Sequence, residues 1–405
     1  MFNVQRKLYI QSKNYFSVLK IIKSKNHKVR LIGGIVRDSI LGIESHDVDI
    51  ATSMRPEVVL KTFNSLGFTA IPTGIKFGTV TVLCNGEVFE ITTLRKDISS
   101  NGRHPKIEYT DNFYLDALRR DFTINALSYC PFKEKIYDYF TGIKDLELGL
   151  VRFIGNANSR IMEDYLRILR FFRFFGKFGK QIDVNSLDSC VKNREFIKKI
   201  SKERIKSEFD SILKLPNYCE LIILMNNLSV LQEILPISII KLNQFISAED
   251  LSYRLTIELN HETKYALLFA LGGFLTYVDL INLKFSRIEA KSISDLLLIL
   301  KSRKSIDKIF LKKIWLEKNN FSQYFIFLAS IFQLEKEIEA MFLSLKNRKR
   351  PLFPINGKDI IYLGFSGRTV GVILNSIKIK WIESDCTLLK EDLVKIKEKY
   401  EKYNY

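Results

Sequence analysis

The chain has 405 residues and carries 63 Lys and Arg against 45 Asp and Glu, a formal net charge of +18. This length allows several folded parts with a sizeable core, and the charge favours a polyanionic partner, either nucleic acid or an anionic membrane surface. The longest uncharged run, Asn319 to Leu334, is too short to span a bilayer and opens with two Asn. We therefore expect a buried helix there and another from Tyr265 to Val278.

The cysteines and the N-terminus bear on the compartment. The cysteines are scattered without a CxxC pair, which favours reduced thiols and argues against a zinc site. The N-terminus lacks a secretory apolar core, so we expect a cytoplasmic protein. Its basic character leaves a mitochondrial presequence as the alternative.

The first part of the chain mixes strand and helix patterns. Asn85-Gly86 separates two alternating runs and is typical of a two-residue hairpin. Strand patterns fade from about Arg152, so we expect an α+β fold with an N-terminal mixed sheet followed by an all-α remainder. The elements expected before that point are helices at 4–25 and at 58–66 after Pro56, and strands at 28–32, 48–51, 79–83 and 88–94.

Residues 31–51, LIGGIVRDSILGIESHDVDIA, combine a glycine turn with two aspartates. Gly33-Gly34 ends an apolar run and brings the backbone close to whatever is bound, beside Arg37. Asp47 and Asp49 are two apart in an expected strand and therefore project to the same side. A divalent cation relieves their mutual repulsion, and Mg²⁺ prefers such oxygen ligands. The alternative is an acidic surface loop beside an ordinary glycine turn.

GGIVRD followed by DVD resembles the head domain of the class II CCA-adding nucleotidyltransferases and the bacterial poly(A) polymerases, both of the polymerase beta superfamily. The resemblance implies that Asp47 and Asp49 hold two Mg²⁺ ions, one for the terminal 3′-hydroxyl of tRNA and one for the triphosphate. It also implies that Gly34, Arg37 and Arg120 hold the phosphates and sugar of the nucleotide. Arg120 belongs to the segment RRDFTINA, which matches the family. The alternative is that its paired arginines lie at the solvent-exposed start of a helix.

The expected hairpin adds an acidic residue and a segment that separates the two branches of the family. Glu90 either completes a two-metal site or is a surface residue on an edge strand. GTVTV at 78–82 resembles the CCA-adding branch, whereas the poly(A) polymerases tend to carry a basic segment there. Residues 96–109 read as a polar loop, in which Asn101 stands where the family usually has an acidic residue. A poly(A) polymerase and a CC-adding enzyme are the alternatives to CCA addition.

The segment EDYLRILRFFR at 163–173 matches the nucleotide-selecting motif of the family, and we expect it to be helical. Cytosine and adenine both present an amine donor beside a ring-nitrogen acceptor, whereas guanine and uracil reverse that order. A carboxylate and a guanidinium can therefore select C and A without a template. The resemblance gives this role to Asp164 and Arg167, with Arg170 and Arg173 behind them. The alternative is a plain salt bridge between Asp164 and Arg167, which are three residues apart.

Beyond this motif the resemblance thins. SKERI at 201–205 resembles a family motif, and we expect Glu203 and Arg204 to brace the nucleotide-selecting helix. Farther on, phosphate contact along an RNA backbone is expected from a basic face. Its members are Lys301, Arg303, Lys304, Lys308, Lys312 and Lys313.

The resemblance implies a CCA tRNA nucleotidyltransferase that uses CTP and ATP, binds tRNA and Mg²⁺, and does not bind a membrane. A non-catalytic RNA-binding protein is the alternative from another class, against which the paired carboxylates argue. The expected parts are a catalytic head at 1–150, a neck at 151–215, a body at 216–345 and a tRNA-binding tail at 346–405.

Overall fold

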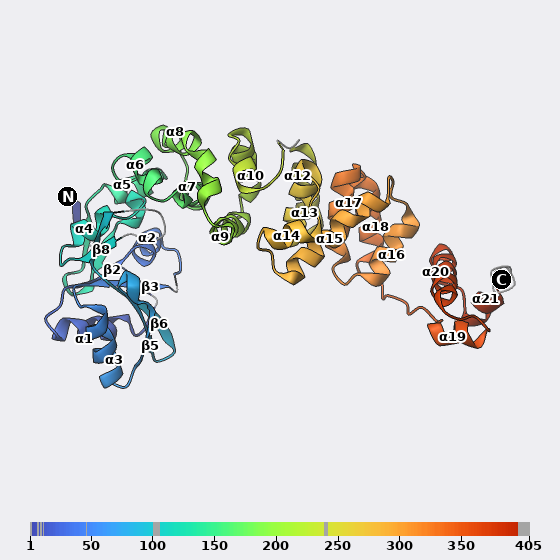
Figure 1. Cartoon of the computed structure of the whole chain (residues 1–405), viewed down its shortest axis with the longest axis horizontal. Helices are drawn as coiled ribbons and strands as arrows, with labels where there is room; N and C mark the ends of the chain where they lie inside the picture. The colour runs from blue at the N-terminus through green and yellow to red at the C-terminus, as the bar shows by residue number, and fades with distance from the viewer. Residues whose placement is uncertain are drawn as a thin grey trace. The chain divides into compact units, whose positions relative to one another are not determined.

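The computed structural model describes residues 2–5, 8, 10, 12–45, 47–99, 106–238 and 242–395. It forms two compact units, Met1–Leu235 and Pro236–Tyr405, called unit 1 and unit 2 below (Figure 1). The division falls at Leu235-Pro236, and the expected head and neck both lie in unit 1. The finer division into four parts stays a prediction.

Unit 1 contains the mixed sheet that the sequence predicted. Among the described residues it has eight strands in the order β1-β10-β9-β2-β3-β6-β5-β4. Only β3 and β6 pair in parallel within that described sheet. The bounds are β1 Phe2–Gln5, β2 Val29–Ile32, β3 Val48–Thr52, β4 Thr69–Gly74, β5 Thr79–Cys84, β6 Glu87–Thr93, β9 Ser128–Cys130 and β10 Lys135–Asp138.

The predicted hairpin is confirmed, and a second hairpin replaces part of an expected loop. Asn85 and Gly86 both have positive φ, at 48° and 81°, as a two-residue turn between β5 and β6 requires. Residues 96–109 were expected to be a loop, but Arg95–Ser99 (β7) pairs antiparallel with Lys106–Tyr109 (β8). The polar composition concealed this pairing. Residues 100–105, including Asn101, lie outside the described part of the chain.

The expected helix at 4–25 is wrong in its first half. Phe2–Gln5 forms edge strand β1, and α1 spans only Tyr15–Ser24. Strand β1 pairs with β10, at least 130 residues away in the chain. A pairing over that separation leaves no local signal, because only the folded sheet supplies the partner strand.

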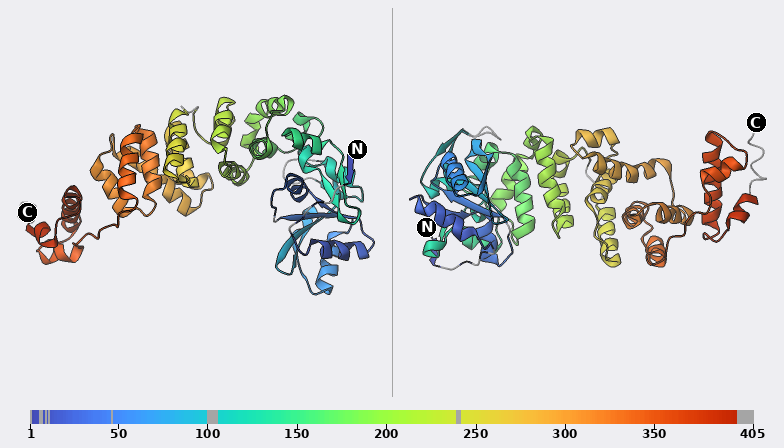
Figure 2. Two further views of the ribbon diagram at one scale, coloured as in Figure 1. Left: turned by 180° about the vertical axis from the view of Figure 1, so that it is seen from behind. Right: turned by 90° about the horizontal axis from the view of Figure 1, so that it is seen from below.

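Opposite faces of the sheet have different coverings (Figure 2). Helices α1 and α3 (Pro56–Ser65) pack on one face, where Leu19, Phe63 and Ile50 belong to a single buried cluster. On the other face, α4 (Phe113–Leu118) packs through Phe113 against Ala51 and its neighbours. Since Asp49 is two residues before Ala51 on β3, it shares the face that carries α4.

The rest of unit 1 is helical, as the sequence predicted. Helix α7 packs against α9 and α10. The helices, in addition to those above, are α2 Gly34–Leu41, α5 Gly142–Leu148, α6 Ala157–Glu163, α7 Leu166–Phe178, α8 Val184–Lys192, α9 Lys202–Leu213, α10 Tyr218–Asn227 and α11 Leu231–Ile234. Short 3₁₀ turns occur at Ile75–Phe77, Thr123–Asn125, Pro131–Lys133 and Arg194–Lys199.

The described part of unit 2 is entirely helical. The predicted buried helix at 319–334 is confirmed as α17, whose residues 323–330 are all buried. The second predicted helix is interrupted, because α13 ends at Gly272 and α14 begins at Tyr277. The helices are α12 Asn243–Leu255, α13 His261–Gly272, α14 Tyr277–Asn282, α15 Arg287–Ser302, α16 Lys308–Glu317, α17 Phe321–Phe332, α18 Glu335–Leu345, α19 Gly357–Tyr362, α20 Arg368–Glu383 and α21 Lys390–Lys395. No helix among the described residues is both long and apolar enough to cross a membrane.

The first prediction concerns Gly142, the first residue of α5. A Cβ added there would lie 2.3 Å from the carbonyl oxygen of Thr123, and the Gly142 N–H donates to Asp138 at 2.9 Å. We expect Gly142→Ala to destabilise unit 1 by about 1–3 kcal/mol, because a backbone atom cannot give way cheaply. Chemical denaturation measures this change.

The matched control is Gly371→Ala in α20, where an added Cβ meets open space. Removing a glycine from a helix interior should stabilise by about 0.5–1 kcal/mol. Equal effects of the two substitutions would contradict the packing argument.

Candidate active site

The turn at Gly33 brings the backbone against two charged side chains. Gly33 precedes α2 with φ +67° and ψ −127°, a conformation open almost only to glycine. An added Cβ would lie 3.2 Å from Nη1 of Arg120 and 3.7 Å from Oδ2 of Asp49. The glycine therefore allows a guanidinium and a carboxylate to meet beside the start of a helix, as expected of a phosphate-binding turn.

Carboxylates gather on the sheet face at β3 and β6. Asp49 is directly paired in parallel register with Glu90, so the two side chains stand on the same face. Burial raises the pKa of Asp49 to about 6; Arg120 opposes this shift, while Glu90 and Asp47 add to it. The structure thus brings Glu90 beside the predicted pair, and its role as a third metal ligand stays a prediction.

This donor set fits a divalent cation. A buried carboxylate with a raised pKa beside other carboxylates is relieved by positive charge, and carboxylate oxygens suit Mg²⁺. Within the described ranges, no group of three or more His, Cys, Asp or Glu side chains is gathered closely enough to hold a metal by itself. Magnesium sites commonly use one or two carboxylates and take further oxygens from substrate phosphates.

Arg37 lies behind the glycine turn. Its side chain is only 7% exposed, its Nε donates to Asp38 at 2.8 Å, and its Nη1 donates to Asn125. The guanidinium also lies over the ring of Phe178 at 4.3 Å. As the side chain stands, it fastens α2 to the segment after Arg120. Its contact with a nucleotide phosphate, and that of Gly34, stay predictions.

Asp116 is a supporting residue that sequence reasoning missed. It is buried on α4 and pairs with Arg119 at 2.8 Å and with Arg120 at 3.3 Å. Burial opposes its ionisation, but the two arginines outweigh burial and lower its pKa. Arg120 also donates to the carbonyl of Asn125 at 3.3 Å. The spacing of Asp116 and Arg120, four residues apart, was the available signal.

Asp164 does not lie within a helix, contrary to the prediction. Helix α6 ends at Glu163, Asp164 is extended with φ −156°, and α7 begins at Leu166. Oδ1 of Asp164 accepts the Leu166 N–H at 3.2 Å, and its carbonyl accepts the Arg167 N–H at 3.0 Å. An aspartate that caps the following turn competes with helix continuation, and this local bond separates α6 from α7.

The alternative reading of a salt bridge between Asp164 and Arg167 is also wrong. Among the described residues, Arg167 pairs with Glu163 at 2.6 Å and donates to the carbonyl of Arg160 at 2.7 Å. Asp164 instead accepts from Arg204 of α9 at 2.7 Å. The two proposed base-reading side chains are therefore held by different partners, and Arg204 has the bracing contact expected of it.

Arg170 and Arg173 extend the polar cluster along α7. Arg170 pairs with buried Asp121 at 2.6 Å, and although burial opposes ionisation, this arginine helps to lower the pKa of Asp121 to about 2. Arg173 pairs with Glu208 of α9 at 2.6 Å. A cavity of about 540 Å³ adjoins these contacts. Its lining is Leu166, Ser201, Glu203, Arg204, Ser207 and Glu208.

Arg160 connects the two halves of the site. Its guanidinium donates to the carbonyls of Arg119 and Arg120 and pairs with Glu163. Arg120 acts electrostatically on Asp49, and contacts run from Arg120 through Arg160 and Glu163 to Arg167. The carboxylate site and the nucleotide-selecting motif belong to one polar network within unit 1.

Two family models match this chain, and nearly all of the matched residues lie in unit 1. Residues 29–152 match the poly A polymerase head domain. Residues 181–238 match a model described as the probable RNA and SrmB-binding site of polymerase A. Together the two matches cover the strands from β2 to β10 and the helices α8 to α11.

Relatives extend the likeness to nearly the whole chain. It is 33% identical over 398 residues to mouse CCA tRNA nucleotidyltransferase 1, mitochondrial, spanning 93% of this chain and 88% of the mouse protein. The chain belongs to the CCA tRNA nucleotidyltransferase family. A CCA-adding enzyme of Lactobacillus johnsonii is 41% identical over 194 residues, about half of either chain.

Solved structures of the family share the fold. The CCA-adding enzyme of Bacillus stearothermophilus, crystallised with CTP, matches with a TM-score of 0.72 and 24% identity over 97% of this chain and all of that one. The Thermotoga maritima enzyme complexed with tRNA matches with a TM-score of 0.70 and 22% identity over 96% and 95%. At these identities the likeness concerns the fold, which confirms the expected α+β architecture.

The second prediction tests which ion pair holds Asp164. A double-mutant cycle of Asp164→Asn with Arg204→Ala should give a coupling free energy of unfolding of about 0.5–1 kcal/mol, because both side chains are partly exposed. The asparagine keeps an oxygen for the Leu166 N–H. The matched cycle of Asp164→Asn with Arg167→Ala should be additive within about 0.3 kcal/mol. The reverse order of couplings would contradict the observed pairing.

Proposed function

We propose that the chain adds C, C and A to the 3′ end of tRNA, using CTP and ATP and releasing pyrophosphate. The observation that carries the proposal is the chain of contacts from Arg120, beside Asp49, through Arg160 and Glu163 to Arg167. The near neighbour Asp164 is held separately, by Arg204. The family membership and the names of the relatives support it. The chemistry joins the 3′-oxygen of the RNA to the α-phosphorus and breaks the bond to pyrophosphate.

The residues at the sheet would position the reacting groups. Asp47 and Asp49 would hold Mg²⁺, which when bound supplies positive charge to the triphosphate and to the attacking oxygen. Arg120 would face the phosphates and sugar beside Asp49, held in place by Asp116. The turn at Gly33 and Gly34 would let the phosphates approach the start of α2.

Asp164 and Arg167 would read the base. The carboxylate accepts from the exocyclic amine of C or A, and the guanidinium donates to the ring nitrogen. Nη1 of Arg167 is occupied by Glu163 and by the Arg160 carbonyl, whereas within the described residues Nη2 makes only a long contact of 3.4 Å, to the carbonyl of Arg119. Nη2 is therefore the donor that a base would take. Arg170 and Arg173 would stiffen the helix behind this pair.

A poly(A) polymerase and a CC-adding enzyme use the same head. The relatives that span most of the chain are named as CCA tRNA nucleotidyltransferases, which favours complete CCA addition. Incubating the chain with tRNA that lacks CCA and with each labelled nucleotide separates the three activities. Addition of A alone in long tracts would contradict CCA addition, and so would a stop after CC.

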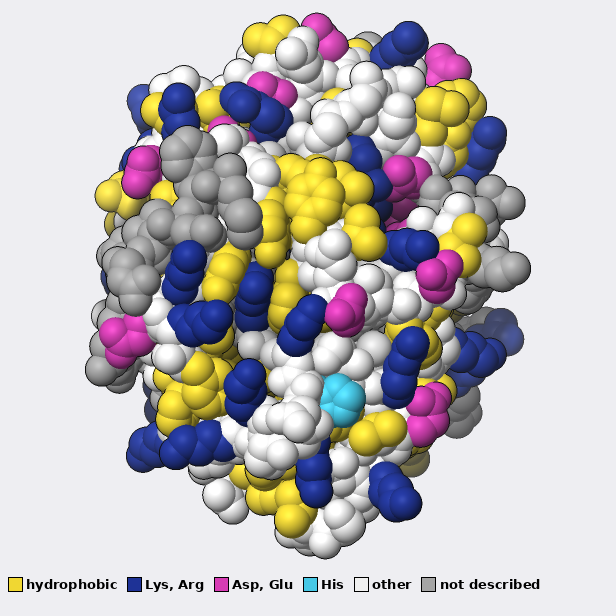
Figure 3. All heavy atoms as spheres, turned by 90° about the vertical axis from the view of Figure 1, so that its left-hand side faces the viewer, with side chains coloured by type: hydrophobic (Ala, Val, Ile, Leu, Met, Phe, Trp, Pro, Cys, Tyr) yellow, Lys and Arg dark blue, Asp and Glu magenta, His cyan; other side chains and the backbone are white. Residues whose placement is uncertain are grey.

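The division of labour follows the sequence boundaries. We assign chemistry to residues 1–150, nucleotide selection to 151–215, a helical body to 216–345 and tRNA binding to 346–405. Lys and Arg side chains are spread over the face of unit 1 seen in Figure 3, which suits contact with a polyanion. We assign the chain to the cytoplasm, although the vertebrate relatives are named as mitochondrial.

The third prediction concerns the carboxylate site. Asp49→Ala should abolish the addition of C and of A while leaving the Kd for tRNA nearly unchanged, because RNA is held largely by basic groups. Single-turnover addition and filter binding measure the two effects. Asp111→Ala is the control, since Asp111 is an exposed carboxylate of unit 1 paired with Lys28. Retained activity in Asp49→Ala would contradict the assignment.

The fourth prediction concerns base choice. Arg167→Ala removes a charged donor worth about 1.5–3 kcal/mol, so selectivity for C and A over U and G should fall roughly ten- to a hundredfold. Single-turnover incorporation of each nucleotide measures the ratios.

The control for this substitution is Arg152→Ala, which removes ion pairs to Asp145 and Asp183 in the same unit. It should change stability without changing selectivity. If Arg167→Ala lowers the incorporation of all four nucleotides by the same factor, Arg167 serves only to hold the structure.

A further inference from the structure

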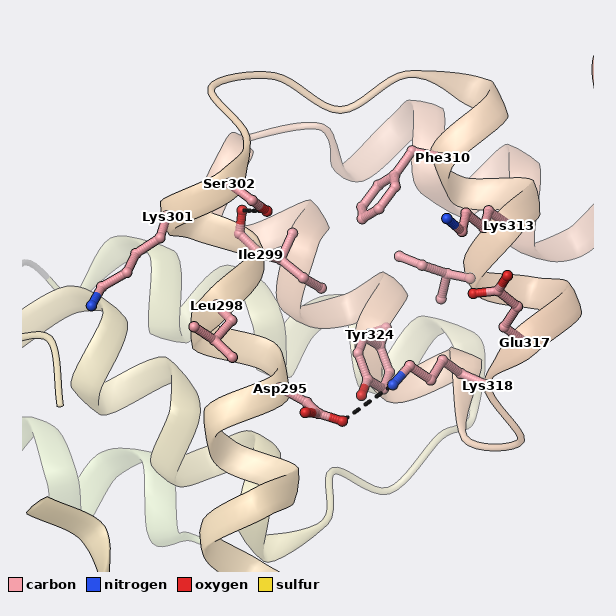
Figure 4. Close-up of a pocket in the computed structure, with 11 residues that line it drawn as sticks. Asp295, Leu298, Ile299, Lys301, Ser302, Phe310, Lys313, Glu317, Lys318 and Tyr324 are labelled. Carbon is pink, nitrogen blue, oxygen red and sulfur yellow. Dashed lines mark hydrogen bonds and ion pairs between the residues drawn. The ribbon is translucent and has the colours of Figure 1, made fainter. Parts of the chain in front are cut away.

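Unit 2 contains a cavity at the junction of α15, α16 and α17. Its volume is about 500 Å³, within the range of ligand pockets. Leu298 and Ile299 of α15 and Phe310 and Ile314 of α16 form apolar walls. Figure 4 shows Phe310 pointing toward Ile299 across the cavity.

The acidic groups of this cavity are already neutralised. Asp295 pairs with Lys318 at 3.2 Å on the floor, next to Tyr324 (Figure 4). Glu317 pairs with Lys378 of α20 at 2.6 Å. Neither carboxylate is therefore left to repel an anion that approaches the mouth.

Two lysines of the lining keep their charge unneutralised. In the described part of the chain, neither Lys301 nor Lys313 forms an ion pair, and Lys301 lies over the ring of Phe274 at 4.1 Å. Residues 301–318 contain seven Lys and Arg against two Asp and Glu. Lys312, expected on the same face, instead pairs with Asp385 at 2.7 Å. Of the lysines in this segment without an ion pair in the described chain, Lys301 and Lys313 line the cavity, and Lys304 and Lys308 do not.

The walls offer a surface for a flat apolar group. Leu298 is 51% exposed, and Phe310 is partly exposed. Arg303 lies over the ring of Phe310 at 4.0 Å. An aromatic ring backed by a guanidinium and flanked by lysines is the combination that binds single-stranded nucleic acid through stacking and phosphate contact.

We infer that this cavity is an RNA-binding site of unit 2, with phosphates of the tRNA backbone at Lys301 and Lys313 and an unstacked base against Leu298 and Phe310. The inference rests on the proposed function for the identity of the RNA. A polyanion suits the unneutralised lysines, and a base suits the apolar walls. An uncharged fatty acyl chain would use the apolar walls but would carry no negative charge for Lys301 and Lys313 to bind.

The first experiment measures the salt dependence of tRNA binding. Lys301→Ala with Lys313→Ala should raise the Kd for tRNA roughly tenfold and flatten the plot of log K against log salt by about 0.7–0.9 per lysine. KM for tRNA should rise in step, whereas kcat at saturating tRNA and KM for CTP should not change. The control is Lys291→Ala with Lys336→Ala, which removes two exposed lysines of unit 2 outside the cavity lining.

The second experiment separates base contact from phosphate contact. Leu298→Ala changes an exposed side chain, and Phe310→Leu keeps an apolar wall without a ring. Each should raise the Kd for tRNA about fivefold with an unchanged salt slope, because stacking releases no counterions. A Tm equal to that of the parent chain shows that the variants fold.

The site is overturned if the Kd for tRNA of the Lys301→Ala, Lys313→Ala variant is unchanged, or rises only as much as that of the control pair. CCA addition by the parent chain would still stand. The site is also overturned if the two lysine substitutions weaken binding to phosphatidylserine vesicles and leave binding to tRNA unchanged. If the parent chain adds neither C nor A, the proposed function fails, and the salt slopes still decide whether the cavity binds RNA.

Discussion

A buried acid between two arginines supports the candidate active site. Asp116 holds Arg119 and Arg120, and Arg120 in turn faces Asp49 across the Gly33 turn. Removing Asp116 would leave two guanidinium groups without a buried counter-charge, which is far more costly than losing an exposed pair. The positive charge beside Asp49 therefore depends on a carboxylate that itself lies outside the proposed metal site.

Separate anchoring of Asp164 and Arg167 bears on the base selection proposed for them. If the two side chains paired with each other, a base would have to break that pair before it could be read. Their partners are instead Arg204 and Glu163, so neither group has to release the other before it contacts a base. Pre-organised donors and acceptors discriminate better than flexible ones, because less freedom is lost on binding.

Positive charge serves different ends in the two units. In unit 1, arginines near the site are paired with buried acids such as Asp121, so they position helices as well as carry charge. In unit 2, the acids at the cavity are neutralised while Lys301 and Lys313 keep their charge. Unpaired lysines attract phosphates at long range and in a salt-dependent manner, whereas paired arginines fix geometry.

The sequence by itself determined the mixed sheet, the Asn85-Gly86 hairpin and the helical remainder, because these depend on local periodicity and turn chemistry. Motif spacing also proposed most residues of the candidate site, although it missed Asp116. It placed Asp49 on a strand correctly, whereas Asp47, expected on the same strand, directly precedes β3, which begins at Val48. Only the tertiary structure decided that β1 pairs with β10, that Glu90 stands beside Asp49, and that Arg204 rather than Arg167 holds Asp164. Those contacts join segments far apart in the chain. The free energy of such a contact depends on the groups that folding brings together, and no local pattern specifies those groups.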